Sequence, residues 1–264
     1  MSADADPTKI RKGDRDDPRA IHQRIAADLR DEILSGDIVE GSRLPSTAQL
    51  IARFGSSNAS IQKAVQLLKD EGLVTSRAGA SVQVREQRRH VMTPANYSAP
   101  AAPGETYRWI AEAANKGHAA SSTLLAVREV PAPREVADAF GLPEGGHATQ
   151  RVQLLELDGE PAELVESYYP VDLAQGTALA EFRKIKGGTP TLLAQLGHPP
   201  APGGTHDRIS ACIPTQAQYK ALRLPSELIP ILRTFRTVRS VQGRIIEATI
   251  MAKAGHLYEL SYTF

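Results

Sequence analysis

Apolar residues in the first third of the chain recur at helical spacing. An isoleucine or leucine stands at every fourth position from 21 to 33, which predicts an amphipathic helix over residues 19–34. A second helix is predicted to begin after Ser46, because serine is a favourable N-cap, and a third helix is predicted over residues 58–71. A glycine-containing turn at 55–57 joins the last two, and two short helices joined in this way are typical of a helix-turn-helix.

Short runs of apolar residues in the rest of the chain are typical of strands. Residues 73–85 predict a β-hairpin with a small tip. Further along, the turn dipeptides Asp158-Gly159 and Gln242-Gly243 each separate two strand-like runs, so these runs are predicted to pair antiparallel. Strands are predicted over 123–130, 149–157, 162–169, 209–213, 231–241, 244–251 and 257–264, and helices over 107–115, 131–140, 171–182, 189–196 and 215–222. The predicted fold class is α+β: a winged helix-turn-helix followed by a mainly antiparallel sheet with helices.

Changes in composition divide the chain into four parts. Residues 1–17 carry charges of both signs and almost no apolar residue, which predicts a disordered tail. Residues 18–87 are predicted to form the winged helix-turn-helix domain and residues 105–264 a second domain. The Pro- and Ala-rich residues 88–104 are predicted to be an extended linker between them.

Whole-chain composition indicates where the protein acts but not whether it binds DNA. Of the 264 residues, 41% are hydrophobic, and the formal net charge of +1 neither supports nor opposes nucleic-acid binding. The N-terminus lacks the apolar core of a signal peptide, and no apolar run approaches the ~20 residues of a membrane helix. The single cysteine, Cys212, precludes an intrachain disulfide and a cysteine-based zinc site. These features predict a protein of the reducing cytoplasm with no membrane partner.

The sequence contains none of the common signatures of catalysis. It has no G-x-S-x-G, no H-E-x-x-H and no phosphate-cradling glycine loop. The seven histidines are scattered, and His206-Asp207 is the only adjacent pair of a histidine and an acid. We therefore predict no catalytic residue, no cofactor and no metal site.

Amide side chains line one face of the third predicted helix. Asn58, Gln62 and Gln66 are four residues apart, so they stack on the same side. Such residues are often only hydrated, and the pattern alone leaves two interpretations open: a solvated face, or a face that reads base edges.

The order of motifs in residues 21–84 resembles the winged helix-turn-helix of GntR-family regulators. The segments that carry the resemblance are I-L-S-G, E-G-x-x-L-P-S, S-x-x-S-I-x-x-A, L-x-x-E-G-L-V and a wing glycine. The resemblance implies binding to double-stranded operator DNA. The residues it implies in DNA contact are Ser46, Arg53, Ser57, Asn58, Ser60, Gln62, Lys63, Arg77 and Gly79. Candidates for phosphate contacts, which set register rather than sequence, are Arg53, Ser57, Lys63 and Arg77.

Departures from the family pattern bear on the operator sequence. Thr47-Ala48 stands where most relatives have Glu-Arg, and the wing keeps only one of its usual glycines. Asn58 and Gln62 occupy positions where relatives commonly place arginines that read guanine. Amides suit the acceptor–donor edge of adenine, so A·T pairs are expected beneath these two residues.

The second domain resembles the UTRA effector domain of the HutC branch of GntR regulators, which has a chorismate-lyase-like fold. The segments that carry this resemblance are R-V-Q-L-L-E-L-D-G-E-P, E-S-Y-Y-P, R-T-F-R-T with G-R-I-I-E-A-T, and Y-E-L-S-Y. It implies an effector site formed by Arg108, Arg151, Gln153, Ser167, Tyr169 and Glu247. Sugar-phosphate binders repeat an arginine where this chain has Gln153, which weakens a phosphate clamp. Purely structural roles for these residues, as surface, core or ion-pair positions, stay open.

Together the two resemblances imply a homodimeric transcription repressor. It would bind a pseudo-palindromic operator through twofold-related helices and be released by a small-molecule effector. Two alternatives stay open: an effector-independent repressor, for example of plasmid transfer genes, and a lyase-like enzyme.

Overall fold

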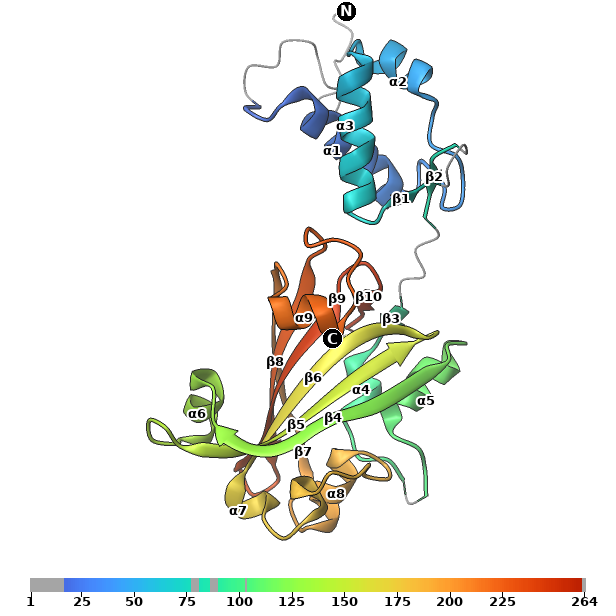
Figure 1. The fold of residues 1–264 in the computed structure, drawn as a ribbon. Helices are drawn as coiled ribbons and strands as arrows, with labels where there is room; N and C mark the ends of the chain where they lie inside the picture. Colours follow the sequence, from blue (N-terminus) through green and yellow to red (C-terminus); the bar gives the residue numbers. More distant parts are fainter. Residues whose placement is uncertain (1–16, 77–80, 86–89, 103, 263–264) are drawn as a thin grey trace, which may run out of the picture. The chain divides into compact units, whose positions relative to one another are not determined.

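The computed structural model describes residues 17–76, 81–85, 90–102 and 104–262. The chain forms two compact units, Met1–Arg88 and Arg89–Phe264 (Figure 1). Most of the predicted tail, residues 1–16, and two predicted DNA contacts, Arg77 and Gly79, lie outside the described residues.

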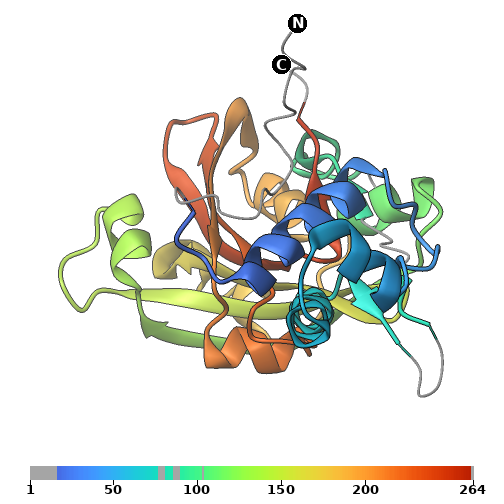
Figure 2. The same cartoon turned by 90° about the horizontal axis from the view of Figure 1, so that it is seen from above.

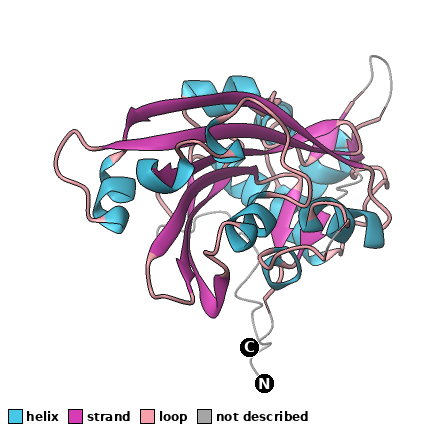
Figure 3. Ribbon diagram, turned by 90° about the horizontal axis from the view of Figure 1, so that it is seen from below, coloured by secondary structure: helices cyan, strands magenta, loops and turns pink. Residues whose placement is uncertain are grey.

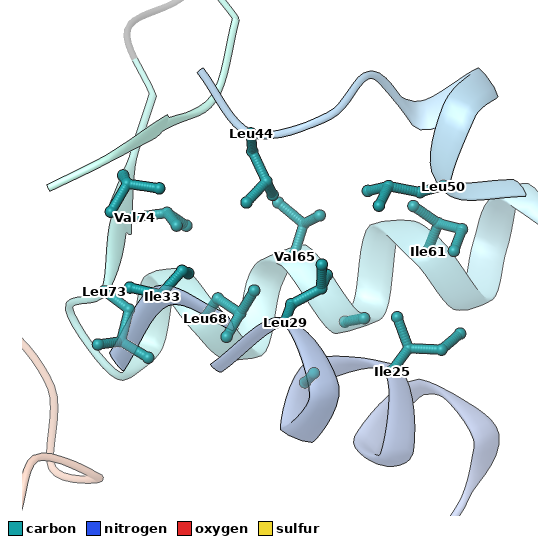
Figure 4. Close-up of a cluster of buried hydrophobic side chains, with 13 residues drawn as sticks. Ile25, Leu29, Ile33, Leu44, Leu50, Ile61, Val65, Leu68, Leu73 and Val74 are labelled. Atoms are coloured by element: carbon teal, nitrogen blue, oxygen red, sulfur yellow. The ribbon is translucent and has the colours of Figure 1, made fainter. Parts of the chain in front are cut away.

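Three helices and a short hairpin make up the first unit. Its elements are α1 (Ile21–Ser35), α2 (Thr47–Phe54), α3 (Asn58–Asp70), β1 (Val74–Thr75) and β2 (Gln83–Val84). The apolar stripes of α1 and α3 share one buried cluster, in which Leu29 and Ile33 of α1 lie near Val65 and Leu68 of α3 (Figure 4). The predicted helix-turn-helix is therefore confirmed, with helix ends within two residues of the predicted ones.

Local hydrogen bonds fix where α2 and α3 begin. The Ser46 side chain accepts from the Gln49 N–H, and the Gln49 side chain accepts from the Ser46 N–H in return, which forms a capping box. Gly55 ends α2 with a φ of 58°, a left-handed conformation that glycine adopts without steric cost. Ser57 then caps α3, so the turn between the helices is specified by a glycine and a serine.

The described part of the hairpin follows α3 directly. Val74 pairs with Val84, and both are buried against the helices. Arg43 forms a further bridge to Gln83. The hairpin is thereby tied both to the helical core and to the segment that precedes α2.

A six-stranded antiparallel sheet is the centre of the second unit. Its order is β4-β5-β6-β9-β8-β7, and its strands run side by side in Figure 3. The strands are β4 (Ala120–Pro131), β5 (His147–Leu157), β6 (Glu160–Pro170), β7 (Pro200–Cys212), β8 (Ile231–Ser240) and β9 (Ile245–Ala254). The helices are α4 (Pro94–Tyr97), α5 (Arg108–Asn115), α6 (Arg134–Phe140), α7 (Val171–Ala174), α8 (Thr189–Gln195) and α9 (Gln216–Ala221). The predicted α+β class and antiparallel pairing are confirmed.

Apolar side chains on the central strands point alternately to the two faces of the sheet, and helices pack on each face. On one face Leu164 and Ala252 pack with residues from α9 and the segment after it. On the other face Val165 and Met251 pack against Trp109 of α5. Helices α5 and α6 lie at opposite ends of β4 (Figures 1 and 2). The central strands β5, β6, β8 and β9 therefore carry few exposed positions, whereas the edge strands β4 and β7 carry many.

The prediction that residues 88–104 form a linker is wrong for most of that segment. Strand β3 (His90–Met92) pairs in parallel with β10 (Tyr258–Leu260), and α4 follows it. Met92 and Tyr97 are buried in the cluster around Trp109. The Pro- and Ala-rich composition of this segment is typical of a linker and gives no sign of the packing. The strand that pairs with β3 lies at the other end of the domain, so no local pattern reveals the pair.

The helix predicted over residues 171–182 is also interrupted. It consists of α7 and a single turn of 3₁₀-helix, η1 (Ala178–Ala180). Gly176 separates them with a φ of 72°, a conformation that cannot continue a right-handed helix.

We expect Leu68→Ala to destabilise the first unit by about 2–5 kcal/mol, because it leaves a cavity at a fully buried position. Gln66→Ala, on the exposed face of the same helix, should change stability by no more than about 0.5 kcal/mol. Urea unfolding of the full chain, followed by helical circular dichroism, measures both. Equal midpoints for the two variants would contradict this packing.

Candidate functional site

Helix α3 presents a polar face to solvent. Asn58, Gln62, Lys63 and Gln66 are all exposed. The buried residues of α3 are Ile61, Ala64, Val65 and Leu68. Nε2 of Gln62 donates to Oγ1 of Thr47 at 3.4 Å. This contact gives Thr47, a departure from the family pattern, a role in orienting Gln62.

The three serines predicted to contact DNA also have structural roles. Ser46 and Ser57 are the N-caps of α2 and α3. Oγ of Ser57 lies 3.1 Å from Oγ of Ser60 and accepts from the Ser60 N–H at 3.2 Å. The hydroxyls of Ser57 and Ser60 are therefore grouped at the start of the exposed face of α3.

Arg53 is held by an acidic residue of α1. Its Nη1 donates to Oε2 of Glu32 at 2.9 Å, and its Nη2 contacts Oε1 of the same carboxylate. The guanidinium also lies 4.8 Å from the centre of the Phe54 ring. A phosphate contact by Arg53 would have to replace or share this ion pair.

The second unit contains a cavity of about 150 Å³. Its floor is one face of four neighbouring strands, β5, β6, β9 and β8. The register places Arg151 opposite Ser167 and Ser167 opposite Thr249, so residues two apart on each strand face the cavity. The floor residues are Arg151, Gln153, Leu155, Glu163, Val165, Ser167, Arg236, Val238, Glu247, Thr249 and Met251.

The opposite wall comes from helices and from a glycine turn. Tyr97, Tyr107 and Trp109 line the cavity from the segments before and within α5, and Gly188 and Thr189 line it at the start of α8. Gly188 has a φ of 82°, and a Cβ there would lie 2.5 Å from the Tyr107 ring. A side chain at position 188 would therefore displace this wall.

Four of the six predicted effector residues line the cavity, namely Arg151, Gln153, Ser167 and Glu247. Arg108 and Tyr169 do not. Tyr169 is fully buried in the apolar cluster that includes α7 and residues of α8. Arg108 precedes Trp109 on α5, and its neighbours in sequence, not Arg108 itself, contact the cavity.

The guanidinium of Arg151 holds a backbone segment. Its Nη1 donates to the carbonyls of Ala178, Leu179 and Glu181 at 2.9–3.0 Å, and its Nη2 donates to that of Arg183 at 2.8 Å. Arg151 is only 2% exposed. These four contacts fix the segment before α8, and they leave little of this cation available to a bound anion.

Glu247 is a buried carboxyl with hydroxyl neighbours. Oγ1 of Thr249 donates to its Oε1 at 2.8 Å, and Oγ of Ser167 donates to the same oxygen at 3.4 Å. Desolvation by burial raises the pKa of Glu247, because removal from water disfavours the charged form. The site therefore combines hydroxyl groups with a carboxyl that is readily protonated.

Two ion pairs neutralise the other buried charges around the cavity. Nε and Nη2 of Arg236 each donate to a carboxylate oxygen of Asp207 at 2.7 Å. Nζ of Lys253 donates to Oε1 of Glu163 at 2.6 Å, and the Tyr258 hydroxyl donates to Oε2 at 2.9 Å. The cavity is polar, and the charges of Arg236 and Glu163 at its lining are each paired with an opposite charge.

Sequence reasoning missed several lining residues, among them Trp109, Glu163, Arg236 and Thr249. The sequence did contain a signal for two of them, Glu163 and Thr249. Because side chains alternate along a strand, the choice of Ser167 and Glu247 implied positions 163, 165, 249 and 251 on the same face. Trp109 and Arg236 gave no such signal.

Comparison with known families accounts for both units. Residues 21–84 match the description "Bacterial regulatory proteins, gntR family", and residues 115–259, more than half of the chain, match the UTRA domain. The chain belongs to the GntR family, as a UTRA-containing regulator of the HutC type. It is therefore a DNA-binding transcription regulator with an effector-type second domain.

Known proteins resemble this GntR regulator over its whole length or over half of it. An uncharacterised HTH-type transcriptional regulator of Streptomyces coelicolor, SCO4628, is 27% identical over 94% of each chain. The histidine utilization repressor of Klebsiella aerogenes is 28% identical over 50% of each chain. The crystal structure of a GntR-family transcriptional regulator covers 93% of this chain and 98% of its own, with a TM-score of 0.64 at 20% identity, which supports the fold.

Within the described residues of this GntR regulator, no helix is both long enough and apolar enough to span a bilayer. The longest, α1, has 15 residues, fewer than the ~20 that a span requires.

We expect Glu247→Gln to stabilise the second unit at neutral pH. The folded-state pKa of Glu247 is raised, so above the ordinary value of about 4.3 the unfolded chain loses a proton that the folded chain retains. Glu247 therefore lowers stability as the pH rises through this window. The advantage of the neutral variant should be absent at about pH 4 and grow with rising pH.

Urea unfolding followed by fluorescence of Trp109, the only tryptophan, measures this effect from pH 4 to 8. Glu144→Gln, at an exposed position, is the matched control and should show no pH-dependent difference from wild type. A variant that loses stability relative to wild type as the pH rises would contradict the assigned direction.

Proposed function

We propose that this regulator is a homodimeric repressor that reads its operator through α3 and is released by a small uncharged effector. The observation that carries the proposal is that one chain has both an exposed amide face on α3 and an enclosed polar cavity in the second unit. The name of the histidine utilization repressor, a relative over half of the chain, supports the repressor assignment.

Base reading is assigned to Asn58 and Gln62. Both are exposed on α3, one turn apart, and an amide can accept and donate to the paired edge of adenine. The contact between Gln62 and Thr47 restrains the side chain before DNA binds, which lowers the entropic cost of ordering it. Lys63, Ser57 and Ser60 are assigned to phosphates.

Two copies of α3 would dock on a pseudo-palindromic operator. Helix-turn-helix proteins place twofold-related recognition helices in major-groove half-sites one helical turn or a multiple apart. Effector binding would favour a dimer in which the two reading helices have the wrong separation. The effector then shifts a pre-existing equilibrium by its differential affinity for the two dimer geometries.

The cavity suits an uncharged polar ring rather than a phosphorylated sugar. Its volume of about 150 Å³ corresponds to roughly a six-membered ring. Arg151 already donates to four carbonyls and Arg236 is paired with Asp207, so a phosphate would have to compete with these partners for both guanidinium groups. Ser167, Thr249 and Glu247 instead offer hydroxyl and carboxyl groups to a ligand's own hydroxyls or amides.

Asn58→Ala and Gln62→Ala should each weaken specific operator binding by about 1–3 kcal/mol, roughly 5- to 150-fold, with little effect on unrelated DNA. Lys63→Ala should weaken binding to all DNA and lower the salt dependence by about one ion. Gln216→Ala, an exposed amide on α9, is the matched control. The assay is a titration on DNA upstream of the protein's own gene, made at each of several salt concentrations.

If the amide variants bind that DNA as wild type does while the wild type discriminates against unrelated DNA, α3 does not read bases through these residues. If the wild type does not discriminate, the same titration is made on sequences selected from genomic DNA. Failure to select any sequence would contradict a specific regulator.

The effector class is tested with full-length protein and a panel of cyclic polyols and cyclic amides, each beside its phosphorylated form. We expect an uncharged compound to raise the melting temperature and release the operator. Ser167→Ala and Thr249→Val should abolish that release and leave ligand-free operator affinity unchanged. Stronger release by a phosphorylated compound would contradict the neutral cavity.

A further inference from the structure

Two histidines and an aspartate from distant parts of the chain meet at one end of the second unit. His90 is the first residue of β3, His118 follows α5, and Asp158 lies in the turn between β5 and β6. One ligand atom from each lies within 4.8 Å of the other two. The cluster lies outside the cavity lining, and the proposed function does not use it.

The geometry within the cluster is specific. Nδ1 of His118 is 3.0 Å from Oδ2 of Asp158. The His90 and His118 rings are 4.2 Å apart between centroids and nearly perpendicular, at 86°. Asp158 has a φ of 51°, and its Oδ1 accepts from the Ala119 N–H at 2.9 Å. This second contact fixes the carboxylate, so Oδ2 is directed toward the two histidines.

We propose that His90, His118 and Asp158 bind one divalent transition-metal ion of the Zn²⁺ class. Two imidazole nitrogens and a carboxylate oxygen are ligands that Zn²⁺ accepts, and a water or a further group would complete the coordination. Tetrahedral bonds of about 2.0–2.2 Å place ligand atoms about 3.4 Å apart. Ligand atoms as far apart as 4.8 Å would have to close by about 1.4 Å, whereas Nδ1 of His118 and Oδ2 of Asp158, now 3.0 Å apart, would open by about 0.4 Å. Rotation about side-chain bonds can supply shifts of this size.

The surroundings favour capture of a cation. The carboxylate of Asp158 is oriented by the Ala119 N–H, which donates to its Oδ1, and its Oδ2 lies 3.0 Å from Nδ1 of His118. The His118 and Asp158 side chains are 22% and 26% exposed, whereas His90 is buried. An ion can therefore reach His118 and Asp158 from solvent, and the buried His90 can then complete the set of three protein ligands.

Metal binding would add a further link among three segments that hydrogen bonds already connect in part. It would attach β3 to the β5–β6 turn and to the turn before β4. His90 pairs with Tyr258 in the β3–β10 ladder, and the Tyr258 hydroxyl bonds Glu163 and accepts from Trp109. Because Glu163 and Trp109 line the cavity, a bound metal would also stiffen one cavity wall.

The test uses untagged full-length protein, freed of metal by a chelator and titrated with Zn²⁺ by calorimetry. We expect one ion per chain and a higher melting temperature. Asp158→Asn, which keeps the turn and the acceptor for Ala119, should weaken binding by at least about tenfold, as should His118→Ala. His147→Ala, an exposed histidine on β5, should bind as wild type does.

A second readout locates the ion independently of stability. Co²⁺ bound by two imidazoles and a carboxylate absorbs visible light, and this absorption should appear in wild type and His147→Ala but not in Asp158→Asn. Absence of binding by the wild type, or equal affinity in wild type, Asp158→Asn and His118→Ala, would overturn the proposal.

Discussion

Burial of charge is the constraint on which the second unit depends. The central strands of its sheet are buried on both faces, so the polar residues placed on them lose contact with water and need partners within the protein. Arg151 meets this need with four backbone carbonyls, Lys253 with Glu163, and Arg236 with Asp207. Each of these sets of contacts joins segments that are distant in sequence. The polar network therefore specifies the loops around the cavity as much as the apolar clusters do.

The first unit follows the opposite rule. Its core is entirely apolar, formed by the stripes of α1 and α3, and its polar groups face solvent on α3. The few internal hydrogen bonds on this face, such as that from Gln62 to Thr47, are between exposed side chains that water also reaches. In the cavity, by contrast, the arginines Arg151 and Arg236 are already held by partners within the protein. Under the proposed function, these partners rather than the number of arginines would govern whether a phosphate can bind.

Local sequence signals predicted the elements well, and long-range pairing was harder to predict. The four-residue spacing in α1, the caps Ser46 and Ser57, and the Asp158-Gly159 turn each depend on neighbours a few residues away, and each is present in the structure. The β3–β10 pair depends on residues from opposite ends of the domain, and no local pattern reveals it. The partners of Arg151 are main-chain carbonyls, which any sequence would supply. For this reason the lining of the cavity was only partly predicted: four of the six residues proposed for an effector site lie on it.

The β3–β10 pair also has a mechanical consequence. Strand β3 opens the second unit and β10 lies close to the C-terminus, so a parallel ladder fastens the two ends of this unit to each other. A pull that arrives along the backbone before His90 loads the ladder hydrogen bonds in shear, which share the force, instead of separating them one at a time. A load on β3 is thus passed to β10, and from the Tyr258 hydroxyl to Glu163 of β6 in the six-stranded sheet.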